Sequence, residues 1–153
     1  MKLEIRRYQP SDQDAVWDLH RLALEPIGIY ITHGPWDEDL HHIEAVYLGN
    51  GGEFLVGTLD GRIVAMGAFR KTSADQAEVK RMRVHPDFQR RGFGQAIIDA
   101  LEAKARDLGY KMIHLDTSVK QTAAQRFYAK NGYVETGREK HERFTLIFYK
   151  KRL

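Results

Sequence analysis

The stretch AEVKRMRVHPDFQRRGFGQAI, residues 77–97, is the strongest indication in this sequence of how the chain folds. Its first half reads as a strand, but the apolar residues fall at Val79, Met82 and Val84, a step of three and then of two. A slip of this kind is typical of a β-bulge, in which one extra residue changes the alternation of side chains and leaves backbone N–H groups unpaired. We therefore expect a bulged strand that ends near Val84.

The second half of the stretch places a glycine pair, Gly92 and Gly94, where an apolar helical pattern begins. The first turn of a helix carries unpaired N–H groups and the positive end of the helix dipole, and glycine lets an anion approach that backbone. Gln89, Arg90 and Arg91 add donors on the loop side. Together these groups suit a diphosphate or a 3′-phosphorylated nucleotide better than a lone carboxylate. The alternative is the ordinary start of a helix with solvated arginines.

Two common phosphate motifs do not match this loop. The segment GFGQAI lacks the third glycine or alanine of the dinucleotide fingerprint, and it lies too far beyond Val84, with Pro86 between them. No Gly-Lys-Ser/Thr triplet follows, which excludes the nucleotide-triphosphatase loop. The segment QRRGFG, residues 89–94, instead fits the signature Gln/Arg-x-x-Gly-x-Gly/Ala.

Apolar periodicity and the residues that break it predict the remaining elements. Asp60-Gly61 has the chemistry of a tight hairpin turn, while Gly109 and Gly132 stand where helices should end. The expected order is a strand at 3–8, helices at about 12–24 and 37–48, a hairpin at 53–70, the bulged strand, a helix at 92–109, a strand at 111–118, a helix at 122–132, and strands at 133–138 and 143–151.

This order predicts an α/β (α+β) fold in one domain over residues 1–153. The sheet should be mixed, mostly antiparallel and twisted, with about seven strands, about four flanking helices and the bulge in its fourth strand. A chain of 153 residues with 42% hydrophobic and 10% aromatic residues can bury one sizeable core.

Composition narrows the function classes. No apolar run approaches the roughly 20 residues of a membrane span, so we expect no membrane association and a cytoplasmic protein. The absence of cysteine excludes disulfides, thiolate metal sites and a cysteine nucleophile. A net charge of +3 is too small to suggest a nucleic-acid partner.

Metal and serine chemistry have little support. His41 and His42 are adjacent, so on a helix they would point about 100° apart, and no His-Glu-x-x-His motif occurs. None of the three serines lies in a Gly-x-Ser-x-Gly elbow. We therefore predict that the protein uses no metal and is not a serine hydrolase.

These motifs resemble the GNAT superfamily of N-acetyltransferases, which transfer an acetyl group from acetyl-CoA to an amine. Residues 77–110 are similar to the central motif of that family. LDTSVKQTAAQRFYAKNGYVETGR, residues 115–138, resembles the strand, the helix and the Tyr-x-Lys-x-Gly-aromatic motif that follow. The resemblance covers nearly the whole chain, and it implies an acetyl-CoA-dependent N-acetyltransferase.

The resemblance also implies cofactor contacts. The bulged strand would offer backbone groups near Met82, Arg83 and Val84 to the pantetheine arm. The backbone of the loop and the first helical turn would wrap the diphosphate, through Gln89, Arg90, Arg91, Gly92, Phe93, Gly94 and Gln95. Where the family commonly has an asparagine before the tyrosine helix, this chain has Gln121, and the resemblance implies that its amide, on a longer stem, makes the same contact.

Acyl transfer requires a base for the amine proton and stabilisation of the leaving thiolate. Glu78 resembles the glutamate that many family members use as the base; the alternative is an ion pair with a nearby cation. Tyr128 occupies the position of the tyrosine that protonates the thiolate and contacts CoA; the alternative is a core tyrosine beside Phe127. Since there is no cysteine to carry the acetyl group, direct attack in a ternary complex is expected.

The amine acceptor, a small molecule or a protein, should meet the segment between the first two helices or the last hairpin. Tyr30 and Trp36 offer aromatic surface there, and Asp37 to Asp39 suit a cationic acceptor, unless these acids only complement a helix N-terminus. The sequence leaves the oligomeric state open, a homodimer included. The second hypothesis is a sensor or regulatory domain that binds acyl-CoA without turnover; nucleic-acid binding ranks last.

Overall fold

Seven strands form one sheet in the order β1-β2-β3-β4-β5-β7-β6 in a computed structural model that describes residues 2–29 and 34–153. All neighbouring strands are antiparallel except β4 and β5, which are parallel. The predicted mixed, mostly antiparallel sheet is therefore confirmed. The strands are β1 Glu4–Arg7, β2 Glu53–Leu59, β3 Arg62–Lys71, β4 Gln76–Val84, β5 Met112–Ser118, β6 Val134–Lys140 and β7 Thr145–Arg152.

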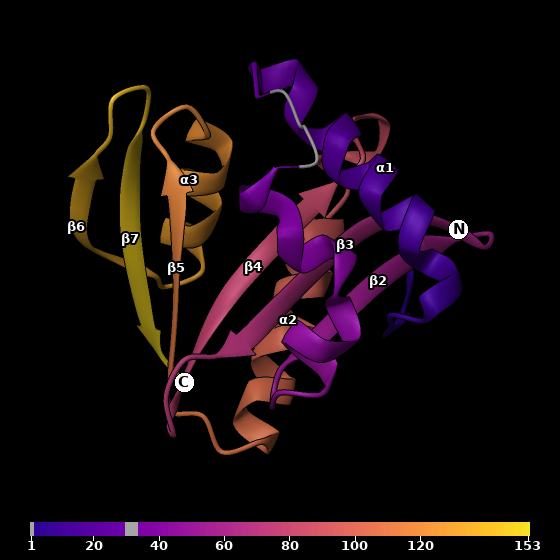
Figure 1. Cartoon of the computed structure of the whole chain (residues 1–153), viewed down its shortest axis with the longest axis horizontal. Helices are drawn as coiled ribbons and strands as arrows, with labels where there is room; N and C mark the ends of the chain where they lie inside the picture. Colours follow the sequence, from indigo (N-terminus) through magenta and orange to yellow (C-terminus); the bar gives the residue numbers. More distant parts are fainter. Residues whose placement is uncertain (1, 30–33) are drawn as a thin grey trace.

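Helices cover both faces of the sheet (Figure 1). Helix α1 (Gln13–Leu24) and the segment 35–48 lie on one face, while α2 (Phe93–Asp107) and α3 (Thr122–Lys130) lie on the other. Each face buries its own apolar cluster, as expected for a sheet whose two sides are both covered. The α2 cluster includes Phe69, Ile97, Ile98, Leu101, Ile113 and Ile147, and the α1 cluster includes Val16, Leu19, Leu40, Tyr47, Phe54 and Met66.

Strand β4 contains a bulge. Ala68 of β3 is opposite Lys80, but two residues earlier Met66 is opposite Arg83, so β4 has one residue more than β3 over this step. Arg81 lies in the extra stretch with a φ of 62°, a left-handed conformation that arginine rarely adopts. The backbone of β4 therefore bends at Arg81.

The parallel pairing of β4 with β5 is short. It joins Gln76–Glu78 only to Met112–His114, after which the two strands diverge (Figure 1). β5 continues instead along β7, to which it is paired over its whole length. The sheet is thus open between the carboxyl halves of β4 and β5, next to the bulge.

The helix predicted over 37–48 is not a single α-helix. Pro35–His41 form a 3₁₀-helix, His42 leaves the helical region, and Glu44–Leu48 form a π-helical turn. The acids in this segment explain part of the difference, since Asp37 and Asp39 both contact one guanidinium. Residues two apart point about 160° apart on an α-helix but about 120° apart on a 3₁₀-helix, so the tighter winding lets both carboxylates reach the same cation.

Candidate active site

A cleft of about 200 Å³ lies where β4 and β5 separate. Residues 78–83 of β4 form one wall and residues 116–118 of β5 form the other. Gln121, Ala124 and Tyr128 line it from the α3 side. Of the predicted cofactor residues, Met82, Arg83, Gln121 and Tyr128 therefore meet in one cleft, although they come from two parts of the chain.

The predicted diphosphate loop lies between β4 and α2. Arg90 and Gly92 both have positive φ, 64° and 81°, and Gly92 is the N-cap of α2 without any side-chain cap. The N–H groups of the first helical turn have no partner further back in the helix, so they remain available to an anion. The Arg91 guanidinium lies 5.1 Å from the centre of the Phe88 ring, and both arginines are exposed.

The first turn of α2 is fixed against α3 and β4. Gln95 and Asn131 exchange two hydrogen bonds, of 2.7 and 3.1 Å, across the two helices. Gly94 has only ordinary space around it, since an added Cβ would stand 3.6 Å from Cγ2 of Val84. Val84 therefore packs beneath the helix start, and it does not line the cleft as Met82 and Arg83 do.

Tyr128 is 6% exposed and lines the cleft, in edge contact with Phe127 and Tyr133. Burial raises the pKa of its hydroxyl, so the group is a protonated hydrogen-bond donor at neutral pH. Gln121 precedes α3, and its Oε1 accepts a 3.0 Å hydrogen bond from the buried Thr117 hydroxyl. This bond ties the start of α3 to β5.

Two carboxylates face the cleft, and only one of them was predicted. Glu78 accepts a 2.8 Å hydrogen bond from Arg70 on the neighbouring strand, so it forms the ion pair that was its alternative interpretation. Asp116 is an exposed residue of β5, and its carboxylate has no hydrogen bond or ion pair to any residue that the structure describes. Its pKa is raised because the surrounding protein reduces its hydration and because Glu78 adds negative charge nearby. Sequence reasoning missed Asp116 because it occupies no position of a recognised motif. The one indication in the sequence was its place near the end of the predicted strand that became β5.

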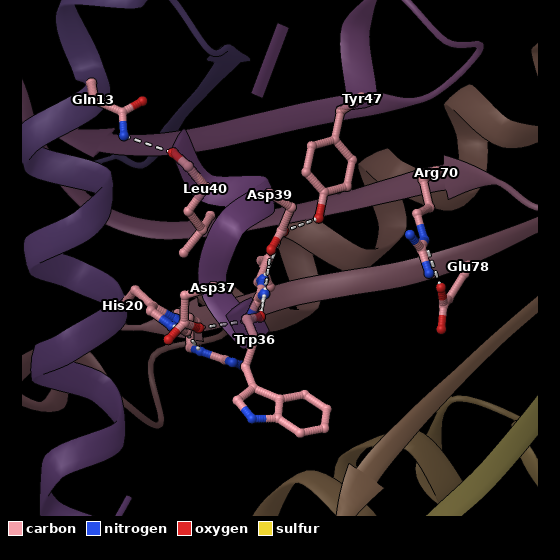
Figure 2. Close-up of polar contacts among 11 residues, drawn as sticks. Gln13, His20, Trp36, Asp37, Asp39, Leu40, Tyr47, Arg70 and Glu78 are labelled. Atoms are coloured by element: carbon pink, nitrogen blue, oxygen red, sulfur yellow. Dashed lines mark hydrogen bonds and ion pairs between the residues drawn. The ribbon is translucent and has the colours of Figure 1, made fainter. Parts of the chain in front are cut away.

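Arg81 directs its side chain away from the diphosphate loop and toward the segment 35–48. Its guanidinium contacts Asp37 and Asp39 and donates a 2.7 Å hydrogen bond to the Trp36 carbonyl. Burial alone would raise the pKa of Asp39, but the Arg81 contact and a hydrogen bond from Tyr47 hold it below its ordinary value. Figure 2 shows these acids among His20, Trp36 and Tyr47. Asp37 and Asp39 are consequently paired with Arg81 and are not free to bind a cationic acceptor, whereas Glu38 is exposed and pairs with His42.

Arg83 lies two residues further along β4 and has different partners. Its Nε donates to Nδ1 of His20 at 3.3 Å and its Nη1 donates to the Met82 carbonyl at 2.7 Å. His20 is fully buried and donates through Nε2 to Asp37 at 2.9 Å. Burial lowers the pKa of His20, which is therefore the neutral acceptor that Arg83 requires.

Trp36 is 80% exposed, and its ring points away from the Asp37–Asp39 cluster (Figure 2). The ring lies edge-on to Phe144 in the loop before β7, with 6.4 Å between centroids. Trp36 thus connects the segment 35–48 with the last hairpin, the two regions predicted to meet the acceptor. Tyr30 lies outside the described residues.

Comparison with known proteins agrees with this geometry. The model of the Acetyltransferase (GNAT) family matches residues 14–133, which include the bulged strand, the diphosphate loop, α2, β5 and α3. The chain belongs to this family. The family model thus covers every element that lines the cleft except β7.

One curated relative of this GNAT protein is the [ribosomal protein bS18]-alanine N-acetyltransferase of Salmonella typhimurium, 30% identical over 82% of this chain and 76% of its own. The match spans only 56% and 57% of the lengths of two other relatives.

Solved structures share the fold. A GNAT-family acetyltransferase from Staphylococcus aureus Mu50 superposes with a TM-score of 0.90 at 22% identity, covering 99% of both chains. The yncA protein of Salmonella typhimurium, solved with its cofactor acetyl-CoA, has a TM-score of 0.79 at 20% identity, covering 98% of this chain and 93% of its own.

Metal-binding clusters and membrane-spanning helices are both absent from the described residues. Within residues 2–29 and 34–153, no three histidine, aspartate or glutamate side chains gather as a metal would require. No helix in the same residues has both the length and the apolar character needed to cross a membrane.

Proposed function

We propose that this GNAT protein is an acetyl-CoA-dependent N-acetyltransferase that acts on a primary amine of a small molecule or a protein. The observation that carries the proposal is the cleft between β4 and β5, which is flanked by the bulge and lined by Tyr128. A family relative that acetylates an alanine amine and a structural neighbour that holds acetyl-CoA support it.

The cofactor would lie along β4 with its diphosphate at the start of α2. Residues 89–95 would hold the diphosphate through backbone N–H groups, because both loop arginines are exposed and Gly92 supplies the necessary turn. The pantetheine arm would follow the bulge near Met82 and Arg83 into the cleft. Its thioester would then lie near Tyr128, between the two halves of the sheet.

The reaction would proceed by direct attack of the amine on the thioester. An alkylammonium has a pKa of about 10.4, so a base must take its proton. Asp116 fits this role better than Glu78, because it has no cation bound to it in the described structure and its pKa is raised. Glu78 would act by adding negative charge that raises the pKa of Asp116, or by accepting the proton through water.

The test combines binding with turnover. Acetyl-CoA binding is measured by calorimetry, and release of CoA is measured with amino acids, polyamines, aminoglycoside antibiotics and peptides as acceptors. We expect one acceptor class to be acetylated. Asp116→Asn should lower kcat at least about tenfold while acetyl-CoA binding is retained.

Two outcomes would contradict the proposal. A protein that does not bind acetyl-CoA would refute it entirely. Binding without turnover for every acceptor class would favour the sensor hypothesis. A ping-pong kinetic pattern would refute only the ternary-complex mechanism.

A further inference from the structure

A cationic side chain in the cleft has no role in the mechanism so far. Arg83 and Arg81 leave the same bulged strand, but Arg81 is neutralised by two carboxylates. Arg83 contacts no carboxylate within the described residues; its Nε and Nη1 donate to an imidazole and a carbonyl, both neutral. A guanidinium carries five N–H donors, so several of them remain for a ligand in the cleft that Arg83 lines.

The position of this charge is fixed. His20 can accept from Arg83 only while it is neutral with its proton on Nε2, and the 2.9 Å bond from Nε2 to Asp37 holds that tautomer. The Met82 carbonyl orients the other arm of the guanidinium from within the bulge. Burial lowers the pKa of Arg83 only to about 10, so the group stays charged at neutral pH.

The leaving group of the proposed reaction needs such a charge. When the amine nitrogen bonds to the acetyl carbon, the C–S bond breaks and its electron pair stays on sulfur. A thiol has a pKa of about 8.5 and a phenol about 10, so a tyrosine does not readily transfer its proton to a thiolate. Burial raises the pKa of Tyr128 further, which makes it a good hydrogen-bond donor and a poor acid.

We propose that Arg83 stabilises the CoA thiolate as it leaves, together with a hydrogen bond from the Tyr128 hydroxyl. The two side chains line the same cleft, one as a cation and the other as a hydrogen-bond donor. The sulfur leaves as the anion, the amine proton goes to a cleft carboxylate, and water protonates the thiolate on release. The inference rests on the proposed function, since it assumes that the thioester reaches this cleft.

Other charges also act on a sulfur in the cleft. Several titratable and charged groups face it or stand behind its walls: Glu78, Lys80 and Arg81 on β4, Arg70 on β3, His114 and Asp116 on β5, Tyr128 on α3, His20 on α1, and Asp37 and Asp39 in the segment 35–48. The carboxylates oppose thiolate formation. Lys80 favours thiolate formation. It is a second cation on β4 that lines the cleft and acts on Asp39 and Asp116, so it provides a matched control for Arg83.

The test titrates the thiol of bound CoA. The whole protein is saturated with CoA, and thiolate absorbance in the ultraviolet is followed with pH against a reference saturated with desulfo-CoA, which cancels tyrosine ionisation. The bound thiol should titrate at least about one pKa unit below free CoA, as expected beside an opposite charge. Arg83→Gln should return the bound thiol pKa to that of free CoA, whereas Lys80→Gln should leave it low.

Three results would overturn the role of Arg83. These are an unshifted pKa of the bound thiol in the natural protein, a low thiol pKa in Arg83→Gln, or a rise of the thiol pKa in Lys80→Gln as large as in Arg83→Gln. If Arg83→Gln does not fold, the natural protein can still refute the inference, because its preference for CoA over desulfo-CoA must grow as pH rises. A protein that binds neither ligand would refute the proposed function as well. Turnover with an unshifted thiol would refute only the Arg83 inference.

Discussion

Replacement of Gly67 by alanine should destabilise the protein and disturb the bulge together. Gly67 lies on β3 opposite the extra residue of β4, between the pairs that show the change of register. A Cβ added there would stand 2.4 Å from Sδ of Met82 and 2.6 Å from Cγ2 of Ile97, where ordinary contacts begin near 3.4 Å. Each neighbour must therefore retreat by about 1 Å.

The two neighbours differ in how easily they can move. Met82 can rotate its flexible thioether, but Ile97 is β-branched, fully buried and fixed on α2. Since relief requires a shift of the helix or the strand, we expect a loss near the upper end of the overpacking range, about 2–3 kcal/mol. With an m-value of about 2 kcal/mol per molar urea, the unfolding midpoint should fall by about 1–1.5 M.

Urea unfolding followed by circular dichroism measures this loss, and calorimetry measures acetyl-CoA affinity on the same samples. Gly137→Ala is the matched control, because Gly137 is also a strand glycine with non-positive φ but has nothing within 4 Å of an added Cβ. The control should change stability by no more than about 0.5 kcal/mol. If Gly67→Ala and Gly137→Ala lower the free energy of unfolding equally, Gly67 does not provide the close packing of Met82 against β3, and the reasoning fails.

Three further predictions concern the loop, the buried acids and the acceptor side. Gly92→Val should weaken CoA binding by at least about tenfold, because a β-branched residue cannot readily adopt a φ of 81°. Arg91→Ala should have a smaller effect at this exposed position, and equal losses of affinity by calorimetry would contradict a backbone-held diphosphate. The folded-state pKa values of Asp37 and Asp39 are lowered, so their contribution to stability is present above about pH 4 and is lost as pH falls further. Asp39→Asn should therefore reduce the difference in unfolding free energy between pH 7 and pH 3, and an unchanged difference would refute the linkage. Trp36→Ala should raise KM for the acceptor several-fold with little change in acetyl-CoA affinity, and the reverse pattern would remove Trp36 from the acceptor side.

Features that depend on local chemistry could be predicted from the sequence. Asp60 and Gly61 both have positive φ, as their turn chemistry indicates, and Gly109 and Gly132 follow helix ends with positive φ. The slip between Val79 and Met82 coincides with the bulge because side-chain alternation is a property of neighbouring residues. The fold followed from these local signals combined with the family resemblance.

Features that depend on distant contacts could not be predicted. The segment 37–48 has the apolar spacing of a helix, but its acids bind Arg81, more than forty residues away. Asp116 gains its significance only from β4 turning away beside it. In the sequence Gly67 is an ordinary strand glycine, and only the fold shows that Met82 and Ile97 occupy the space of a side chain there. In each case a tertiary neighbour that no local pattern encodes changes the meaning of the residue.

The bulge connects the two sides of the proposed reaction through one residue. A left-handed conformation costs a non-glycine residue roughly 1–2 kcal/mol, and Arg81 adopts it without a local reason. Its ion pairs with Asp37 and Asp39 offset that cost, since a well-paired buried arginine is strongly held once formed. The same guanidinium fixes the Trp36 carbonyl. Arg81 therefore holds β4 bent where the thioester would lie while it positions the segment 35–48 that would meet the acceptor, so β4 and that segment cannot shift independently.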